Sequence, residues 1–291
     1  MRSRRALIYV PGSDIHKMEK ATTLDVDGII LDLEDGVSAN RKDDARMFIA
    51  RALADLDFGR SERLVRINPF TSGRAQADLA AVLPGKPDTI VVPKVDTPTI
   101  LMEVDEIITR AEEAMILAKG SIEVIAVIES AKAFVTLPAI CAASPRLTGL
   151  VFGAEDFTAD AGMTRTPAGT ELLYARSALA LHAAAFNLQA IDMVQTNFSD
   201  IERLTSEARQ AVDLGYAGKQ VIHPAQIETV QRVFTPDAAT IEYAQRVISG
   251  AEEAAEDGRG AFSLDGEMVD LPVIKRAQTI LVRARAAGLI P

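Results

Sequence analysis

Residues 28–35 read GIILDLED, an apolar run that closes with three carboxylates. Gly28–Leu33 has no alternating polar face, which is typical of a parallel strand that is covered on both sides. Such a strand gives its terminal acids little access to solvent. We therefore expect at least one of these carboxylates to lie near the protein interior, where it needs a cation, a metal ion or hydrogen-bond donors.

Similar short β-like runs recur along the chain and alternate with stretches of helical periodicity. The predicted strands are ALIYVPG (6–12), GIILDLED (28–35), LVRIN (64–68), TIVVPKV (89–95), IEVIAVIES (122–130), LTGLVFGAED (147–156), QAIDMVQTN (189–197) and GKQVIHP (218–224). Amphipathic stretches such as 41–53, 175–186 and 200–215 lie between them. Eight strand-then-helix units in about 225 residues predict a closed (β/α)₈ barrel of the TIM type, with a doubly wound open sheet as the alternative fold.

The pattern changes after Phe234, and the remaining residues exceed what a barrel needs. Residues 235–258 indicate a long acidic helix, 260–270 a turn-rich or hairpin-like segment, and 271–288 a final helix. We thus predict a catalytic barrel domain over 1–234 and a helical arm over 235–291. The arm either caps its own subunit or packs over a neighbouring one.

Composition narrows the classes of function. The 291 residues carry a formal net charge of −10, which disfavours nucleic acid as a partner. No apolar run approaches the roughly 20 residues of a membrane helix, and the N-terminus resembles no signal peptide, so we expect a cytoplasmic protein. The single Cys141 and three scattered His argue against a disulfide or a zinc site. Basic residues among the first twenty form either a solvated end or a local anion site.

Chemistry in a (β/α)₈ barrel lies at the carboxyl ends of the strands. Glu129 and Asp156 end two runs that would be neighbouring strands, about 4.8 Å apart. Carboxylates that close repel each other unless a cation lies between them, and Mg²⁺ suits a pair because it fills its remaining positions with water and substrate oxygens. Arg66 would reach the same rim, as a structural ion pair or as a contact for a substrate oxyanion or carboxylate. Glu34 and Asp35 would then orient Arg66 and metal-bound water.

Seven motifs, in this order and spacing, resemble the citrate-lyase beta-subunit-like family of acyl-CoA lyases, and within it the stand-alone citramalyl-CoA and malyl-CoA lyases. They are YVPGSD, DGIILDLEDGV, LVRIN, VIES, VFGAEDF, GKQVIHP and GAFSLDGEMVDLP. The resemblance covers essentially the whole chain. It implies a (β/α)₈ barrel that binds Mg²⁺, with Mn²⁺ as a substitute, and coenzyme A thioesters. It also implies a homotrimer or a dimer of trimers.

The resemblance assigns roles to matching positions. Glu129 and Asp156 match the metal ligands, Arg66 the residue that contacts the reacting oxygens, and Asp270 an acid that reaches a neighbouring subunit's active site. The matching positions for coenzyme A are Tyr9, His16, Lys20, Ile222 and His223. Position 16 is often Lys in relatives, and an imidazole there weakens a phosphate contact at neutral pH.

The implied reaction cleaves a 3-hydroxy-3-carboxyacyl-CoA, such as citramalyl-CoA or malyl-CoA, to acetyl-CoA and pyruvate or glyoxylate. Asp270 is the candidate for protonating the acetyl-CoA enolate. The base for the hydroxyl stays open between Glu34, Asp35 and metal-bound hydroxide. Three alternatives also stay open: a malyl-CoA thioesterase with the same site, a citrate-lyase beta subunit acting on an acyl-carrier-protein thioester, and a pyruvate-type aldolase.

Overall fold

The computed structural model describes residues 2–291, which form two compact units, one of residues 4–231 and one that contains residues 232–291. The first unit is a closed barrel of eight parallel strands in sequence order, so the predicted (β/α)₈ fold is confirmed. Its strands are β1 (Ala6–Pro11), β2 (Gly28–Asp32), β3 (Glu62–Arg66), β4 (Thr89–Val92), β5 (Glu123–Ile128), β6 (Leu147–Phe152), β7 (Gln189–Asp192) and β8 (Gly218–Val221).

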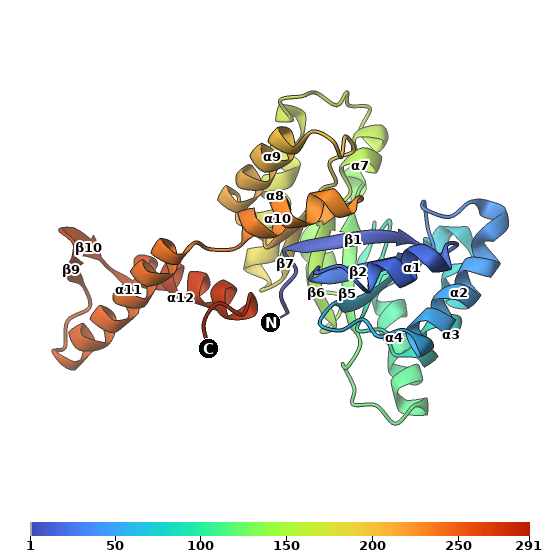
Figure 1. The fold of residues 1–291 in the computed structure, drawn as a ribbon, viewed down its shortest axis with the longest axis horizontal. Helices are drawn as coiled ribbons and strands as arrows, with labels where there is room; N and C mark the ends of the chain where they lie inside the picture. Colours follow the sequence, from blue (N-terminus) through green and yellow to red (C-terminus); the bar gives the residue numbers. More distant parts are fainter. Residues whose placement is uncertain (1) are drawn as a thin grey trace. The chain divides into compact units, whose positions relative to one another are not determined.

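Helices lie outside the strands of this unit (Figure 1). They are α1 (Ile15–Ala21), α2 (Lys42–Asp55), α3 (Ala75–Val82), α4 (Pro98–Ala114), α5 (Ala131–Val135), α6 (Leu137–Cys141), α7 (Ala154–Asp160), α8 (Leu173–Ala185), α9 (Ile201–Asp213) and α10 (Ile227–Phe234). Short 3₁₀ turns are η1 (Ala39–Arg41), η2 (Phe70–Ser72), η3 (Leu83–Gly85), η4 (Thr170–Leu172) and η5 (Pro224–Gln226). All eight strands end earlier than predicted; in particular, β2 ends at Asp32 and β6 at Phe152, so Glu34 lies in the turn after β2 and Asp156 in α7.

The barrel interior is layered, because residues two apart on a strand face the same side. The middle layer is one buried apolar cluster made by Leu7, Ile30, Leu64, Val91, Ile125, Val127, Val151 and Ile191. The residues two positions further towards the carboxyl ends of these strands are polar in four cases, namely Tyr9, Asp32, Arg66 and Glu129. The same alternation that fills the core therefore directs polar side chains to the barrel mouth.

A polar layer closes the opposite end of the barrel around the buried guanidinium of Arg4. Arg4 Nε and Nη2 donate to the two Glu62 carboxylate oxygens at 2.8 and 2.7 Å, and Nη2 also reaches Glu123 at 2.6 Å. Nη1 donates to Thr148 and Gln189, both at 3.0 Å. Arg4 is therefore a structural residue, and the prediction that includes it in a solvated end or an anion site is wrong. Arg5 is likewise paired with Asp27, at 2.7 Å.

The C-terminal unit contains α11 (Ala238–Glu256), β9 (Phe262–Leu264), β10 (Glu267–Val269) and α12 (Leu271–Ala286). The two strands pair antiparallel around Asp265 and Gly266, which both have positive φ, as a tight hairpin turn requires. Apolar residues of α11 and α12 form a core of their own with Val269. The elements match those predicted for 235–288; that this arm caps a neighbouring subunit stays a prediction.

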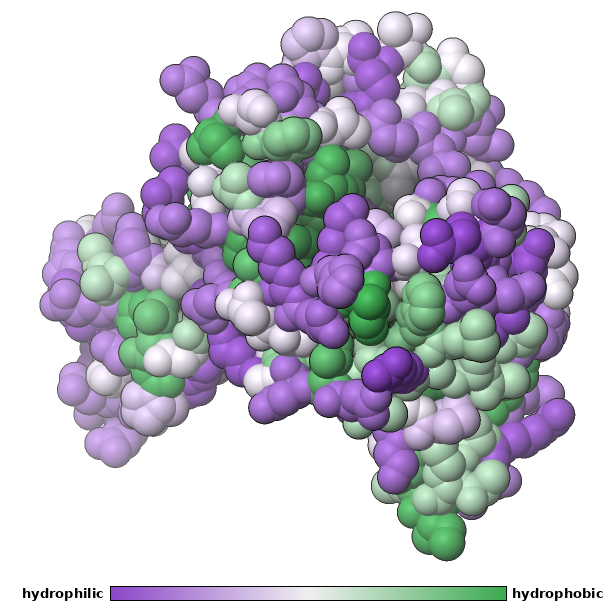
Figure 2. Space-filling view, turned by 45° about the vertical axis from the view of Figure 1, so that its right-hand side comes forward, coloured by the Kyte–Doolittle hydropathy of each residue, from purple (hydrophilic) through white to green (hydrophobic). Residues whose placement is uncertain are grey.

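The surface seen in Figure 2 is largely hydrophilic, with apolar side chains gathered in smaller patches. Within the described part of the chain, no helix has the length and apolarity needed to cross a membrane.

We expect Arg4→Met to lower the free energy of unfolding by about 3–5 kcal/mol, because it leaves the buried Glu62 carboxylate without its partner. Urea denaturation would measure this. Arg51→Met is the matched control, since Arg51 pairs with Asp55 at 3.2 Å while both side chains stay mostly in solvent, and such pairs contribute little. Equal stability of the two variants would contradict the structural role of Arg4.

Candidate active site at the barrel mouth

A pocket of about 360 Å³ opens at the carboxyl ends of the strands. Six of the residues predicted for the site line it: Tyr9, Asp35, Arg66, Glu129, Asp156 and Ile222. Asp32, Phe152 and Gln220 line it as well and were not predicted. Strands far apart in the sequence thus bring their terminal side chains to one place, as the closed barrel requires.

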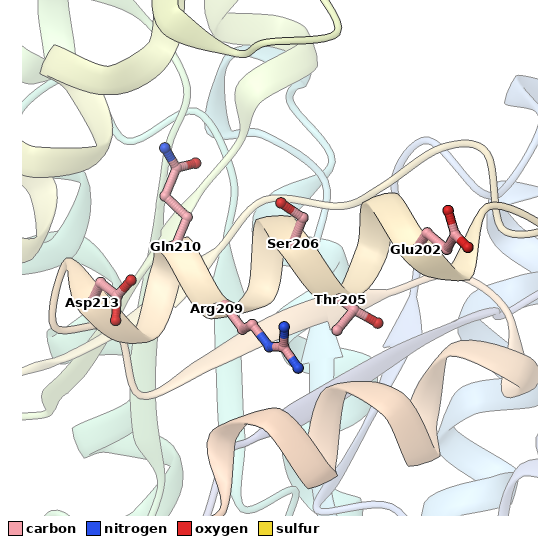
Figure 3. Close-up of a pocket in the computed structure, with 6 residues that line it drawn as sticks. All are labelled: Glu202, Thr205, Ser206, Arg209, Gln210 and Asp213. Atoms are coloured by element: carbon pink, nitrogen blue, oxygen red, sulfur yellow. The ribbon is translucent and has the colours of Figure 1, made fainter.

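A second hollow of about 530 Å³ is larger, yet all of its lining residues belong to α9. Figure 3 shows their side chains along this one helix, with no convergence on a common point. We assign the chemistry to the smaller pocket, because convergent polar groups define a site better than volume does.

Arg66 is held by a carboxylate of the neighbouring strand. Its Nε and Nη2 donate to the two oxygens of Asp32 at 2.7 and 2.8 Å. The two residues are register partners on β2 and β3, so the guanidinium meets the carboxylate directly across the sheet. Asp32 also accepts from the backbone N–H groups of Glu34 and Gly36, both at 2.8 Å. Four donors therefore satisfy this buried acid.

The other two acids of the LDLED turn differ from each other. Glu34 Oε2 lies 2.7 Å from Arg66 Nη1, although the two atoms are not aligned for a hydrogen bond. Asp35 is 3.9 Å away, with 65% of its side chain exposed. Asp32 and Glu34 thus surround Arg66, and the prediction that Asp35 orients Arg66 finds no close contact. Leu64 and Ile30 belong to the barrel core, and residues two positions later on a strand face the same side. This alternation places Asp32 beside Arg66 at the barrel mouth, and it could have identified Asp32 from the sequence.

Burial perturbs two carboxyl groups here. Desolvation raises the pKa of Glu129 to about 8, and repulsion from Glu34 and Asp156 adds to the shift. Desolvation also raises the pKa of Glu34 to about 7, although the charge of Arg66 opposes it. Glu129 lines the pocket, whereas Glu34 is not among the lining residues and lies buried beside Arg66. Perturbed acids at a cleft are typical of functional sites.

Lys94 links the two candidate metal ligands and had no predicted role. Its backbone N–H donates to Glu129 Oε1 at 2.7 Å, and its ammonium lies 3.3 Å from Asp156 Oδ1. Its φ of 52° is in the left-handed region, which is uncommon for a residue other than glycine. The turn after β4 thereby aims the N–H at Glu129.

The remaining predicted coenzyme A positions lie outside the pocket lining. His16 has 89% of its side chain exposed and pairs with Glu19 on α1, where Lys20 is also exposed. His223 caps η5 through Nδ1, which accepts from Ala225 N–H at 3.2 Å, and its ring stacks on Phe198 at 4.5 Å. Their contacts with coenzyme A stay predictions.

Asp270 lies in the C-terminal unit, where it is the N-cap of α12 and accepts from the Val273 N–H at 3.4 Å. Its role as a catalytic acid stays a prediction.

Comparison with known proteins agrees with this geometry. The family HpcH/HpaI aldolase/citrate lyase matches residues 5–224. Mitochondrial citramalyl-CoA lyase of Rattus norvegicus is 39% identical, over 97% of this chain and 86% of its own. Citrate lyase subunit beta of Leuconostoc mesenteroides subsp. cremoris is 40% identical, over 99% and 96% of the two chains.

Among solved structures, CitE of Mycobacterium tuberculosis in complex with magnesium, acetoacetate and coenzyme A is 32% identical, with a TM-score of 0.77 over 97% of this chain and 98% of that one. Some relatives are mitochondrial, so the cytoplasmic location stays a prediction. The predicted resemblance and the enzyme class, a carbon–carbon lyase, are confirmed. The chain belongs to the HpcH/HpaI aldolase/citrate lyase family.

Proposed function

We propose that this enzyme is a magnesium-dependent lyase that cleaves a 3-hydroxy-3-carboxyacyl-CoA, citramalyl-CoA or malyl-CoA, to acetyl-CoA and pyruvate or glyoxylate. The observation that carries the proposal is the pocket itself. An arginine held by two buried acids and a second pair of acids line one cavity at the barrel mouth.

The residues present fit a magnesium ion. Gly153 leaves room for the Glu129 carboxylate, since a Cβ on Gly153 would come within 2.5 Å of Glu129 Oε2. The backbone N–H of Lys94 donates to Glu129 Oε1, so Glu129 Oε2 is available to bind a metal ion. Residues 2–291 contain no cluster of three or more His, Cys, Asp or Glu side chains arranged for a metal. Glu129 and Asp156 form a two-carboxylate set, which suits Mg²⁺ and, with the same oxygen donors, Mn²⁺.

Glu129 and Asp156 would hold the metal ion, which would supply Lewis-acid polarisation of the substrate. Arg66 would stabilise the negative charge that the substrate's hydroxyl oxygen gains as its proton leaves, before this oxygen becomes the keto oxygen on C–C cleavage. Glu34 is the candidate for accepting the hydroxyl proton, because a carboxyl with a pKa of about 7 is matched to this task near neutral pH.

The bond electrons pass to the acetyl-CoA fragment, whose enolate needs a proton. Asp270 is the proposed donor, supplied by a neighbouring copy of the chain. A homotrimer or a dimer of trimers would bring the two together. The thioester would enter past Ile222, which lines the pocket with 40% of its surface exposed.

We expect purified protein with Mg²⁺ to convert citramalyl-CoA or malyl-CoA to acetyl-CoA plus pyruvate or glyoxylate, with the activity lost in EDTA. Mass spectrometry of the thioesters would measure this. Free coenzyme A with an intact hydroxy acid would replace the proposal with a thioesterase. No turnover would favour a subunit that acts on a carrier-protein thioester.

Co-expression of Glu129→Gln and Asp270→Asn would test the shared site. Each variant alone should be inactive, whereas random mixed oligomers should recover about a quarter of wild-type activity, because the two intact residues then meet at some sites. Asn is a good N-cap, so Asp270→Asn should fold. Asp257→Asn, an exposed acid of the same unit, should stay fully active. Near-normal turnover by Asp270→Asn alone would remove Asp270 from the mechanism.

The raised pKa of Glu129 gives a second test, on stability. In the folded state the Glu129 carboxyl keeps its proton up to about pH 8, whereas in the unfolded state it keeps the proton only up to about pH 4.5. The metal-free protein should therefore lose stability as the pH rises from about 4.5 to about 8. Glu129→Gln cannot titrate there. Its thermal midpoint should therefore fall less between pH 5 and about 8 than that of the wild type. Parallel profiles of the two proteins would contradict the raised pKa of the buried Glu129 carboxyl.

A further inference from the structure

A chain of hydrogen bonds below Arg66 has no role in the reaction as derived so far. Gln220 is buried, and its Nε2 donates to the carbonyl oxygens of Phe152 and Asp192, both at 3.0 Å. These carbonyls end β6 and β7. Because both accept hydrogen bonds, they fix which end of the amide is nitrogen. The amide oxygen of Gln220 is therefore turned towards β1.

The partner of that oxygen is the hydroxyl of Tyr9, at 2.8 Å. An amide oxygen only accepts, so the phenol proton is committed to Gln220. Burial raises the pKa of Tyr9, which keeps the phenol neutral. Tyr9 thus cannot give this proton to a substrate while the bond to Gln220 persists, and its hydroxyl serves to fix the ring.

The Tyr9 ring lies against the guanidinium of Arg66, with Cζ 4.6 Å from the ring centroid. Asp32 holds the same guanidinium by its edge, through Nε and Nη2. With the contact to Asp32 alone, the guanidinium plane of Arg66 could still tilt about the line through its two hydrogen bonds. The Tyr9 ring packs against the face of the guanidinium and removes that freedom. Three residues from β8, β1 and β2 therefore define where the remaining N–H groups of Arg66 point.

We propose that Gln220 and Tyr9 are positioning residues for Arg66, with Gln220 fixing the Tyr9 ring and the ring fixing the guanidinium plane. The inference deepens the proposed function, in which Arg66 meets the developing oxyanion. Preorganised donors are effective because their orientation is set before the reaction.

The test combines an Arg66 signal with kinetics. In uniformly ¹⁵N-labelled protein, the Nε–H resonance of Arg66 would be assigned by its loss in Arg66→Lys and followed in Tyr9→Phe, Tyr9→Leu and Gln220→Met. We expect the resonance to move in all three. Tyr9→Phe keeps the ring and should lower kcat/KM modestly, whereas Tyr9→Leu should lower it about 3- to 30-fold, mainly through kcat.

Tyr216→Phe is the matched control. Tyr216 is fully buried and donates to the Arg176 carbonyl at 3.0 Å, so it loses the same kind of bond away from Arg66. It should leave the Arg66 resonance and kcat/KM unchanged. In an Arg66→Lys background, Tyr9→Leu should lower kcat/KM by less than about a further twofold, because the effects of residues that act through one another are non-additive.

An unmoved Arg66 resonance in Tyr9→Leu and Gln220→Met would overturn the proposal. So would an equal loss of kcat/KM from Tyr9→Leu with and without Arg66. Absence of lyase turnover in the wild type would count against the proposed function alone, since the resonance reports on Arg66 without any substrate.

Discussion

The paired hydrogen bonds between Arg66 and Asp32 are the constraint on which the barrel mouth depends. A buried arginine needs a compensating charge, and a buried aspartate needs donors. Register pairing of β2 with β3 places the two opposite each other. The backbone N–H groups of the following turn complete the shell of Asp32. This answers why a strand built for burial ends in acids: the first acid holds Arg66, and the turn it stabilises brings Glu34 to the same cation.

The rest of the site follows from the period of two along a strand. One apolar layer separates a polar layer around Arg4 from the polar layer of the pocket. The polar layer around Arg4 is fully paired and closes the barrel. The polar layer of the pocket contains acids with raised pKa values and an arginine in a fixed orientation. The same strands therefore supply stability at one end and chemistry at the other, as is usual for this fold.

Much of this could be predicted from the sequence. Continuous apolar runs separated by helical stretches indicated eight strands, and the run ends indicated Arg66, Glu129 and Asp156, which the structure brings to one pocket. Asp32 and Gln220 were missed because the predicted strands run on to Asp35 and Pro224, so neither residue was considered as a strand end, whereas β2 ends at Asp32 and β8 at Val221. Arg4 was placed in a solvated end or an anion site on charge alone, yet Glu62 and Glu123 come from strands that only closure of the barrel brings to it. Lys94 was given no role, because the presence of a lysine does not indicate the left-handed turn after β4 that brings its N–H group to Glu129.

The measurement that tests the account most directly is the rate of acetyl-CoA formation from citramalyl-CoA and malyl-CoA by Asp32→Asn, compared with the wild type at saturating Mg²⁺. The substitution keeps the shape of the side chain and removes the charge that holds Arg66. We predict a loss of about 10²-fold or more in kcat/KM, comparable to removal of an oxyanion donor, with the fold retained in urea denaturation. Turnover close to that of the wild type would contradict the claim that the Asp32–Arg66 contact organises the active site.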